Sequence, residues 1–155
     1  MDITEIASRL KILDVIGKYA WYCDARLESD DHARLAELAA GLFIEDGVYK
    51  TVRMDGSEHV CRGRENIRDH FGERRAGWVA ASEARGTKRY SRHHVTPLII
   101  EFETPDRAHA SSYVAIIGIG GLYNWGRYLD TFVLEPSGWK FAERIVHVEG
   151  GPGPG

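Results

Sequence analysis

Lys18-Tyr19-Ala20-Trp21-Tyr22-Cys23-Asp24-Ala25-Arg26 closes an amphipathic helical pattern that begins near Ile3. Apolar residues recur three or four positions apart along this pattern, at Ile6, Leu10, Leu13, Ile16, Ala20, Cys23 and Leu27. At about 100° per residue they form one face, with Asp24 roughly 40° from its centre and Tyr19 at its edge. A carboxylate on a core-facing stripe is costly unless it is paired, neutral or beside a cavity. Two interpretations are therefore open: Asp24 faces a cavity that holds its partner, or it ends the helix beside solvent.

Length and composition limit the classes of protein to consider. The chain has 155 residues, a net charge of −3 and two cysteines, Cys23 and Cys61, which lie far apart. We expect one domain over residues 1–149, and a flexible Gly/Pro-rich tail over residues 150–155. Charges of both signs are interspersed and no run of about 20 apolar residues occurs, so we expect neither a nucleic-acid nor a membrane partner. Without a secretory signal or a paired cysteine motif, a cytoplasmic protein with reduced thiols is predicted.

The order of the predicted elements indicates an α+β fold. A second helix follows through Arg34–Ala39, residues 42–47 are expected to form a turn, and a third helix opens at residues 63–67 and ends before a loop at residues 80–88. Period-two patterns predict strands at residues 48–53, 58–62, 90–103, 107–118, 125–135 and 139–148. Helices first and an antiparallel meander afterwards favour helices packed on one face of a curved sheet. Such a sheet leaves a closed-ended pocket in which a small ligand binds.

A second informative stretch is Ser91-Arg92-His93-His94-Val95-Thr96-Pro97-Leu98. Adjacent strand residues point to opposite faces, so only one of His93 and His94 can look into the pocket. Alternation alone does not choose between them. A lone strand histidine is also more often a surface or core residue than a catalyst.

Other side chains are candidates for binding. Three tyrosines, Tyr49, Tyr113 and Tyr128, could supply aromatic walls for a substrate. Asp130 and Arg144 form a candidate pair on the last two strands, either as a cross-strand ion pair or with Arg144 binding substrate. The histidines show no H-x-H, H-x-x-x-H or H-E-x-x-H spacing and no cysteine joins them, so no metal site is predicted.

Seven short motifs in a fixed order carry a family resemblance. They are the helix with Tyr19 and Asp24, Leu42–Val48, Cys61–Ile67, Arg92–Thr96, Asp106–Ala110, Gly126–Asp130 and Gly138–Phe141. Together they resemble the SnoaL-like branch of the nuclear-transport-factor-2-like superfamily, over about Ile6 to Val148. The resemblance implies a cone-shaped α+β barrel, in which a curved, mostly antiparallel sheet wraps around the N-terminal helices. Members of this group commonly dimerise through the sheet face, so a homodimer or higher homo-oligomer is implied.

The resemblance also assigns site residues. Dehydratase and dehydrochlorinase members, such as scytalone dehydratase, bile acid 7α-dehydratase and hexachlorocyclohexane dehydrochlorinase, carry an Asp–His pair at positions matching Asp24 and His93. Tyr19 matches a tyrosine of the bile acid dehydratase. Scytalone dehydratase has a tyrosine immediately before its aspartate, where this chain has Cys23, so that water-orienting arrangement is not reproduced.

These residues suit acid–base chemistry. Imidazole removes a proton next to a carbonyl near neutral pH, and a buried carboxylate on its other nitrogen fixes the tautomer. We therefore expect a cofactor-independent lyase of the dehydratase type, acting on a small hydrophobic cyclic substrate such as a polyketide or steroid. His93 would be the base, Asp24 its orienting partner and Tyr19 the assisting donor. An isomerase or cyclase using the same pair, and a non-catalytic binding module, remain alternatives.

Overall fold

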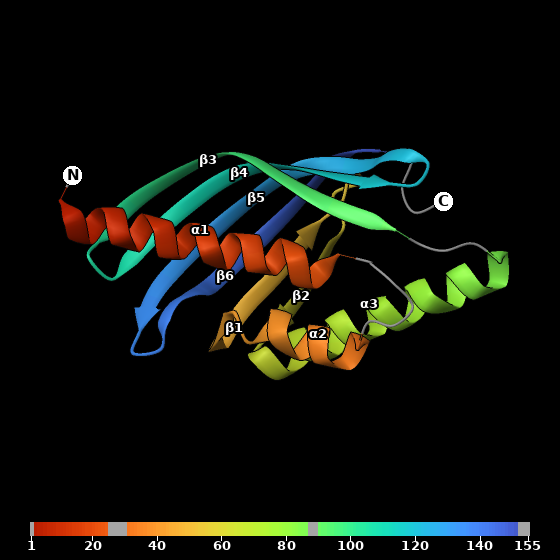
Figure 1. Ribbon diagram of the computed structural model, residues 1–155, viewed down its shortest axis with the longest axis horizontal. Coiled ribbons are helices and arrows are strands. Elements are labelled where there is room, and N and C mark those ends of the chain that lie inside the picture. Colours follow the sequence, from red (N-terminus) through yellow and green to blue (C-terminus); the bar gives the residue numbers. More distant parts are fainter. Residues whose placement is uncertain (1, 25–30, 87–89, 152–155) are drawn as a thin grey trace.

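The computed structural model describes residues 2–24, 31–86 and 90–151 and confirms the α+β prediction. Its elements, in chain order, are α1 (Ile3–Cys23), α2 (His32–Ala40), β1 (Phe43–Val52), β2 (Glu58–Arg62), α3 (Arg64–Arg85), β3 (Ser91–Thr104), β4 (Arg107–Gly118), β5 (Gly121–Glu135) and β6 (Gly138–Gly150). Figure 1 shows α1 lying across the strands of the sheet, with α2 and α3 beside β1 and β2. None of the helices among the described residues is long and apolar enough to cross a membrane.

One curved sheet of six strands carries the fold, in the order β2-β1-β6-β5-β4-β3. All neighbouring strands are antiparallel except β1 and β6, which are parallel. β2 and β3 are the two ends of this order, so the sheet curves around the helices without closing on itself. The long β3–β6 meander matches the run of period-two sequence after Tyr90.

Helix α1 buries a face that only partly overlaps the predicted one. Ile16 of the predicted stripe is buried, together with Ile12, Val15 and Tyr19. Ile6, Leu10 and Leu13 of that stripe are exposed. The sequence offers apolar residues around much of this helix, and the contact with the sheet selects the face centred on Ile12 and Ile16. Leu27, the last residue of the predicted stripe, lies outside the described residues.

Several element boundaries differ from the predictions. β1 already begins at Phe43, although a turn was expected at residues 42–47. Gly47, which was interpreted as a turn residue, instead lies where the pairing of β1 with β6 is irregular, between Phe43 and Val48. A side chain at Gly47 would come within 3.0 Å of the Ile44 carbonyl oxygen. Helix α3 continues to Arg85, six residues into the expected loop, and ends at Gly86 in the left-handed conformation with φ +61°. β6 continues to Gly150, and the rest of the expected tail, beyond Gly151, lies outside the described residues.

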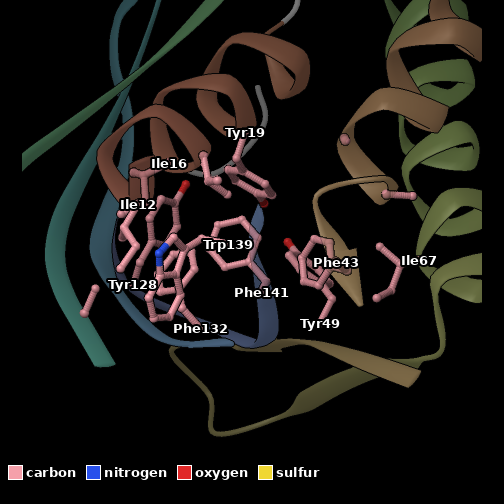
Figure 2. Close-up of a cluster of buried hydrophobic side chains, with 14 of the residues drawn as sticks. Ile12, Ile16, Tyr19, Phe43, Tyr49, Ile67, Tyr128, Phe132, Trp139 and Phe141 are labelled. Atoms are coloured by element: carbon pink, nitrogen blue, oxygen red, sulfur yellow. The ribbon is translucent and has the colours of Figure 1, made fainter. Parts of the chain in front are cut away.

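Aromatic residues dominate the core between α1, α3 and the sheet (Figure 2). Tyr19 lies edge-on to Phe71, Tyr128 and Phe141, with ring centroids 5.9–6.1 Å apart. Such edge-to-face contacts add about 0.5–1.5 kcal/mol per pair beyond area burial. They fix the end of α1 against the inner strands, and the functional site is built at that point.

Candidate functional site

Asp24 lies directly after α1 and is almost completely buried, 4% exposed. Its backbone turns out of the helix at φ −60° and ψ 135°, while its N–H still donates to the Ala20 carbonyl. The negative end of the helix dipole and the burial both disfavour a carboxylate here. Two hydrogen bonds compensate, because the His93 backbone N–H and His93 Nδ1 both lie 2.8 Å from Asp24 Oδ1. The Arg92 Nε is farther away, 3.9 Å from Oδ2.

The predicted pairing of Asp24 with His93 is therefore confirmed in geometry. A carboxylate only accepts hydrogen bonds, so Nδ1 carries the proton and Nε2 keeps its lone pair. His93 lines a cavity that Asp24 does not line, and both residues also line a second hollow of about 520 Å³ between α1 and β3. His94, on the opposite strand face, is exposed, as expected if His93 looks inward.

Burial and charge set the proton affinity of His93. Burial lowers the pKa of His93, the Asp24 hydrogen bond and charge raise it, and the cations Arg74 and Arg144 lower it, with the balance below its ordinary value. The imidazole is therefore neutral at neutral pH and ready to accept a proton. Burial raises the pKa of Tyr19 well above its ordinary value, so its hydroxyl stays protonated as a donor.

The cavity lies between the end of α1, α3 and the inner strands. Tyr19, Tyr49 and Tyr128 line it together with His93, as do Phe71, Trp78 and Trp125. Its free volume is about 90 Å³, which is smaller than the cavity of about 150 Å³ that holds benzene in an engineered protein. Entry of a ring therefore requires side chains in the wall to move.

Two arginines of the cavity were missed by the sequence analysis. Arg74 and Arg75 both line it, and Arg74 Nη1 lies 3.4 Å from the Tyr49 hydroxyl and donates to it. The Arg74 guanidinium also lies 5.3 Å from the centre of the Trp78 ring. The signal was present, since Ile67 and Phe71 predict a helical face that reaches positions 74, 75 and 78 next. The cavity is thus aromatic with a cationic side.

Two of the proposed substrate-binding residues do not reach this cavity. Tyr113 is 57% exposed, because the alternation of β4 turns Ala110, Ser112 and Val114 inward and Tyr113 outward. Arg144 is completely buried behind the wall, where its Nε and Nη2 donate to Asp130 at 2.7 and 2.6 Å. The rings of Tyr19, Tyr128 and Phe141 cover its guanidinium at 4.0–4.2 Å.

One sequence argument about metals is wrong. The sequence analysis associated no cysteine with the histidines, whereas β2 and α3 place Cys61 Sγ 3.3 Å from His59 Nε2 and within 4.8 Å of His70 Nδ1. None of these three residues lines the cavity.

Comparison with solved structures shows the same fold in proteins of low identity. A Mycobacterium tuberculosis protein of unknown function is 23% identical, with a TM-score of 0.67 over 93% of this chain and 73% of that one. A candidate scytalone dehydratase from Novosphingobium aromaticivorans DSM 12444 is 20% identical, with a TM-score of 0.66 over 96% and 88% of the two chains. A nuclear-transport-factor-2-like protein with a cystatin-like fold, from a Novosphingobium aromaticivorans DSM strain, is 23% identical, with a TM-score of 0.65 over 95% and 90%.

A comparison with curated proteins finds no match. Identities below 25% establish the fold and leave the chemistry to the site itself. The profile of the SnoaL-like domain family matches residues 4–145, which include the end of α1, the His93 strand and most of the residues that line the cavity. This chain belongs to the SnoaL-like domain family.

Proposed function

We propose that this protein is a lyase of the dehydratase type, which removes water or another β-leaving group from a compact cyclic carbonyl compound. The observation that carries the proposal is the 2.8 Å contact between Asp24 Oδ1 and His93 Nδ1, with His93 lining the cavity. A buried carboxylate in this position orients the base and stabilises the imidazolium that forms.

The reaction can be written with this chain's residues alone. His93 Nε2 takes a proton from the carbon next to the carbonyl, and the electron pair moves onto the carbonyl oxygen. Tyr19 and Arg74 line the same cavity and can donate to that developing oxyanion. The electrons then return to form the carbon–carbon double bond and expel the β-hydroxyl, which leaves as water with the proton held by His93.

The cavity favours a compact substrate. A steroid or an extended polyketide exceeds the free volume of about 90 Å³ unless the walls rearrange. Trp78 is half-buried and Trp125 is 44% exposed, so both lie where the cavity meets the surface. We expect these two indoles to move when a ring enters, and tryptophan fluorescence during a ligand titration would report that movement.

Proton exchange at carbon tests the chemistry before the natural substrate is known. Small cyclic ketones with a β-hydroxyl group are incubated with the protein in D₂O, and NMR follows deuterium at the α-carbon and the appearance of the enone. His93→Ala should lower both rates by about 10²–10⁴-fold. His94→Ala is the matched control and should leave them unchanged. Equal rates in His93→Ala and the wild type, with both proteins folded, would contradict the proposal.

The same experiment separates the two alternatives. Exchange with migration of a double bond, and no loss of water, would indicate an isomerase or cyclase that uses the same pair. Ligand binding with no exchange for any ketone in the wild type would indicate a binding module.

A further inference from the structure

Three potential metal ligands meet between the edge strand β2 and helix α3, away from the cavity. His59 and Cys61 are two residues apart on β2 and therefore share a face of the strand. His70 comes from α3, which packs beside β2 (Figure 1). His59 Nε2 lies 3.1 Å from His70 Nδ1 and 3.3 Å from Cys61 Sγ, and all three ligand atoms lie within 4.8 Å of one another.

We propose that His59, Cys61 and His70 bind one zinc-like transition-metal ion, with a water in the fourth position. Tetrahedral zinc with the usual bond lengths places two nitrogen ligands about 3.3 Å apart and a nitrogen and a sulfur about 3.6 Å apart. The observed 3.1 and 3.3 Å are slightly shorter than these values, and the third pair, Cys61 Sγ and His70 Nδ1, lies within 4.8 Å. Imidazole and thiolate ligands favour Zn²⁺ and related ions over Mg²⁺ or Ca²⁺.

The simplest alternative is a hydrogen-bonded group without a metal. The two imidazoles are stacked, with centroids 4.5 Å apart and an interplanar angle of 29°, and one proton between their nitrogens would satisfy that contact. In that arrangement the thiol of Cys61, which is only 7% exposed, has the 3.3 Å hydrogen bond to His59 Nε2. Three ligand atoms converging from two elements fit a metal better than a single shared proton.

The surroundings influence the protonation of two of the three ligands, His70 and Cys61. Burial lowers the pKa of His70 to about 4, together with the positive charges of Arg74 and Arg53 and the neighbouring His59. Its ring is therefore neutral at neutral pH. Burial and the negative charge of Glu73 raise the pKa of Cys61. Metal binding must displace the thiol proton, so the affinity should increase with pH.

The ion would connect the edge of the sheet to the helix that carries the cationic side of the cavity. Arg74 is four residues after His70 and thus lies on the same face of α3. A metal at His70 would hold this turn against β2. The inference does not depend on the proposed lyase activity, since none of the three ligands lines the cavity.

Cobalt titration of the chelator-treated protein tests the site. Co²⁺ should bind with a stoichiometry of one per chain at micromolar or tighter affinity and give thiolate-to-cobalt charge-transfer absorption. Zn²⁺ should bleach that absorption and Mg²⁺ should leave it unchanged. Zn²⁺ should also raise the melting temperature of the protein and release a proton on binding. Wild-type protein with no charge-transfer absorption and no calorimetric Zn²⁺ binding would overturn the proposal.

Ligand substitutions give the matched comparison. Cys61→Ser should abolish the charge-transfer absorption, and His70→Ala should weaken Co²⁺ binding by at least about 100-fold, beyond the 10–100-fold cost of changing a residue that only supports a ligand. His59→Gln lies on the edge strand, so it keeps the test valid if the more buried His70 variant fails to fold. Cys23→Ser and His109→Ala remove a thiol and an imidazole elsewhere and should bind as the wild type does. Unchanged Co²⁺ binding in folded His59→Gln and Cys61→Ser proteins would overturn the assignment.

Discussion

Two buried acid–base pairs lie within the same aromatic core but differ in what they leave unbonded. In the Asp130–Arg144 pair, both carboxylate oxygens accept hydrogen bonds from the guanidinium, and three aromatic rings cover the cation. In the Asp24–His93 pair, one oxygen accepts both hydrogen bonds, and the imidazole keeps a second nitrogen beside the cavity. The first arrangement leaves one buried donor, Arg144 Nη1, without a hydrogen-bond partner, but Arg144 does not line the cavity. The second leaves a nitrogen of a residue that lines the cavity.

This difference teaches that burial of a charge alone does not identify a functional residue. Arg144 is more buried than His93, yet Arg144 does not line the cavity. The useful criterion is an atom that can still exchange a proton and that faces a space large enough for a ligand. By that criterion the Asp130–Arg144 pair is structural and the Asp24–His93 pair is catalytic in our proposal.

Arg144→Ala should have the largest effect on stability. It leaves the fully buried Asp130 carboxylate without its partner and removes the cation between three rings, so we expect a loss of about 3–5 kcal/mol in the free energy of unfolding. Urea denaturation followed by circular dichroism measures this loss. A loss below about 1 kcal/mol would contradict the structural role.

The double variant Asp130→Leu/Arg144→Met is the matched control. It removes both charges and keeps most of the volume, so it should recover much of the lost stability. If Arg144 instead bound substrate directly, the double variant would be stable but its KM would rise sharply. Recovery of stability with an unchanged KM is the outcome that fits our assignment.

Much of the fold could be predicted because a long run of period-two sequence begins near Tyr90. The boundaries of β2 and β4 were predicted correctly, since turn residues flank both strands. The buried face of α1 could not be predicted, because both Leu10 and Ile12 are apolar and only contact with the sheet decides which one is covered. Asp24 was expected to be buried because it lies on the apolar face of the helix. It is buried instead because it follows the helix and turns inward with extended backbone angles.

The site was predicted in part. Alternation left His93 and His94 equivalent, and the family resemblance chose His93, which the geometry confirms as the partner of Asp24. Arg75 is buried and was missed because charged residues are normally assigned to the exposed face of a helix. Arg74 is exposed and lines the cavity from the same turn of α3. The group of His59, Cys61 and His70 was missed because only two of its members are close in sequence, on β2. The third, His70, joins them only when α3 packs against β2.

Asp24→Asn should have the next largest effect, and it acts on activity. The amide cannot stabilise the imidazolium and can hold the wrong tautomer of His93, so we expect turnover to fall by at least about 10²-fold. The α-proton exchange assay measures this rate. Asp14→Asn, an exposed position on the same helix, is the matched control and should leave the rate unchanged. Full activity in a folded Asp24→Asn protein would show that the pair is structural, like Asp130–Arg144.

The pH dependence gives a smaller but sharper test. The folded-state pKa of His93 is lowered below 6.5, so the base is neutral above that value and the acid limb of kcat/KM should lie below pH 6.5. The stability that neutral His93 contributes is present above the unfolded pKa and is lost as the pH falls toward the folded pKa. Asp24 raises the His93 pKa, so in Asp24→Asn the acid limb should move to lower pH. A limb above pH 6.5 in the wild type, or one that moves up in the variant, would contradict this electrostatic account.

Tyr19→Phe should have the smallest effect. The phenyl ring preserves the edge contacts to Phe71, Tyr128 and Phe141, so the core and the cover of Arg144 should remain intact. Only one neutral hydrogen bond to the reacting oxygen is lost, worth roughly 1 kcal/mol or about 3–10-fold in rate, and a water could replace part of it. The exchange rate measured beside Tyr113→Phe, an exposed control, gives the effect of the hydroxyl alone. No change would make Tyr19 a packing residue that belongs with the Asp130–Arg144 pair. A loss above about 10²-fold would instead make Tyr19 a proton donor in the reaction and would assign it, with His93, to the pair that keeps a reactive atom.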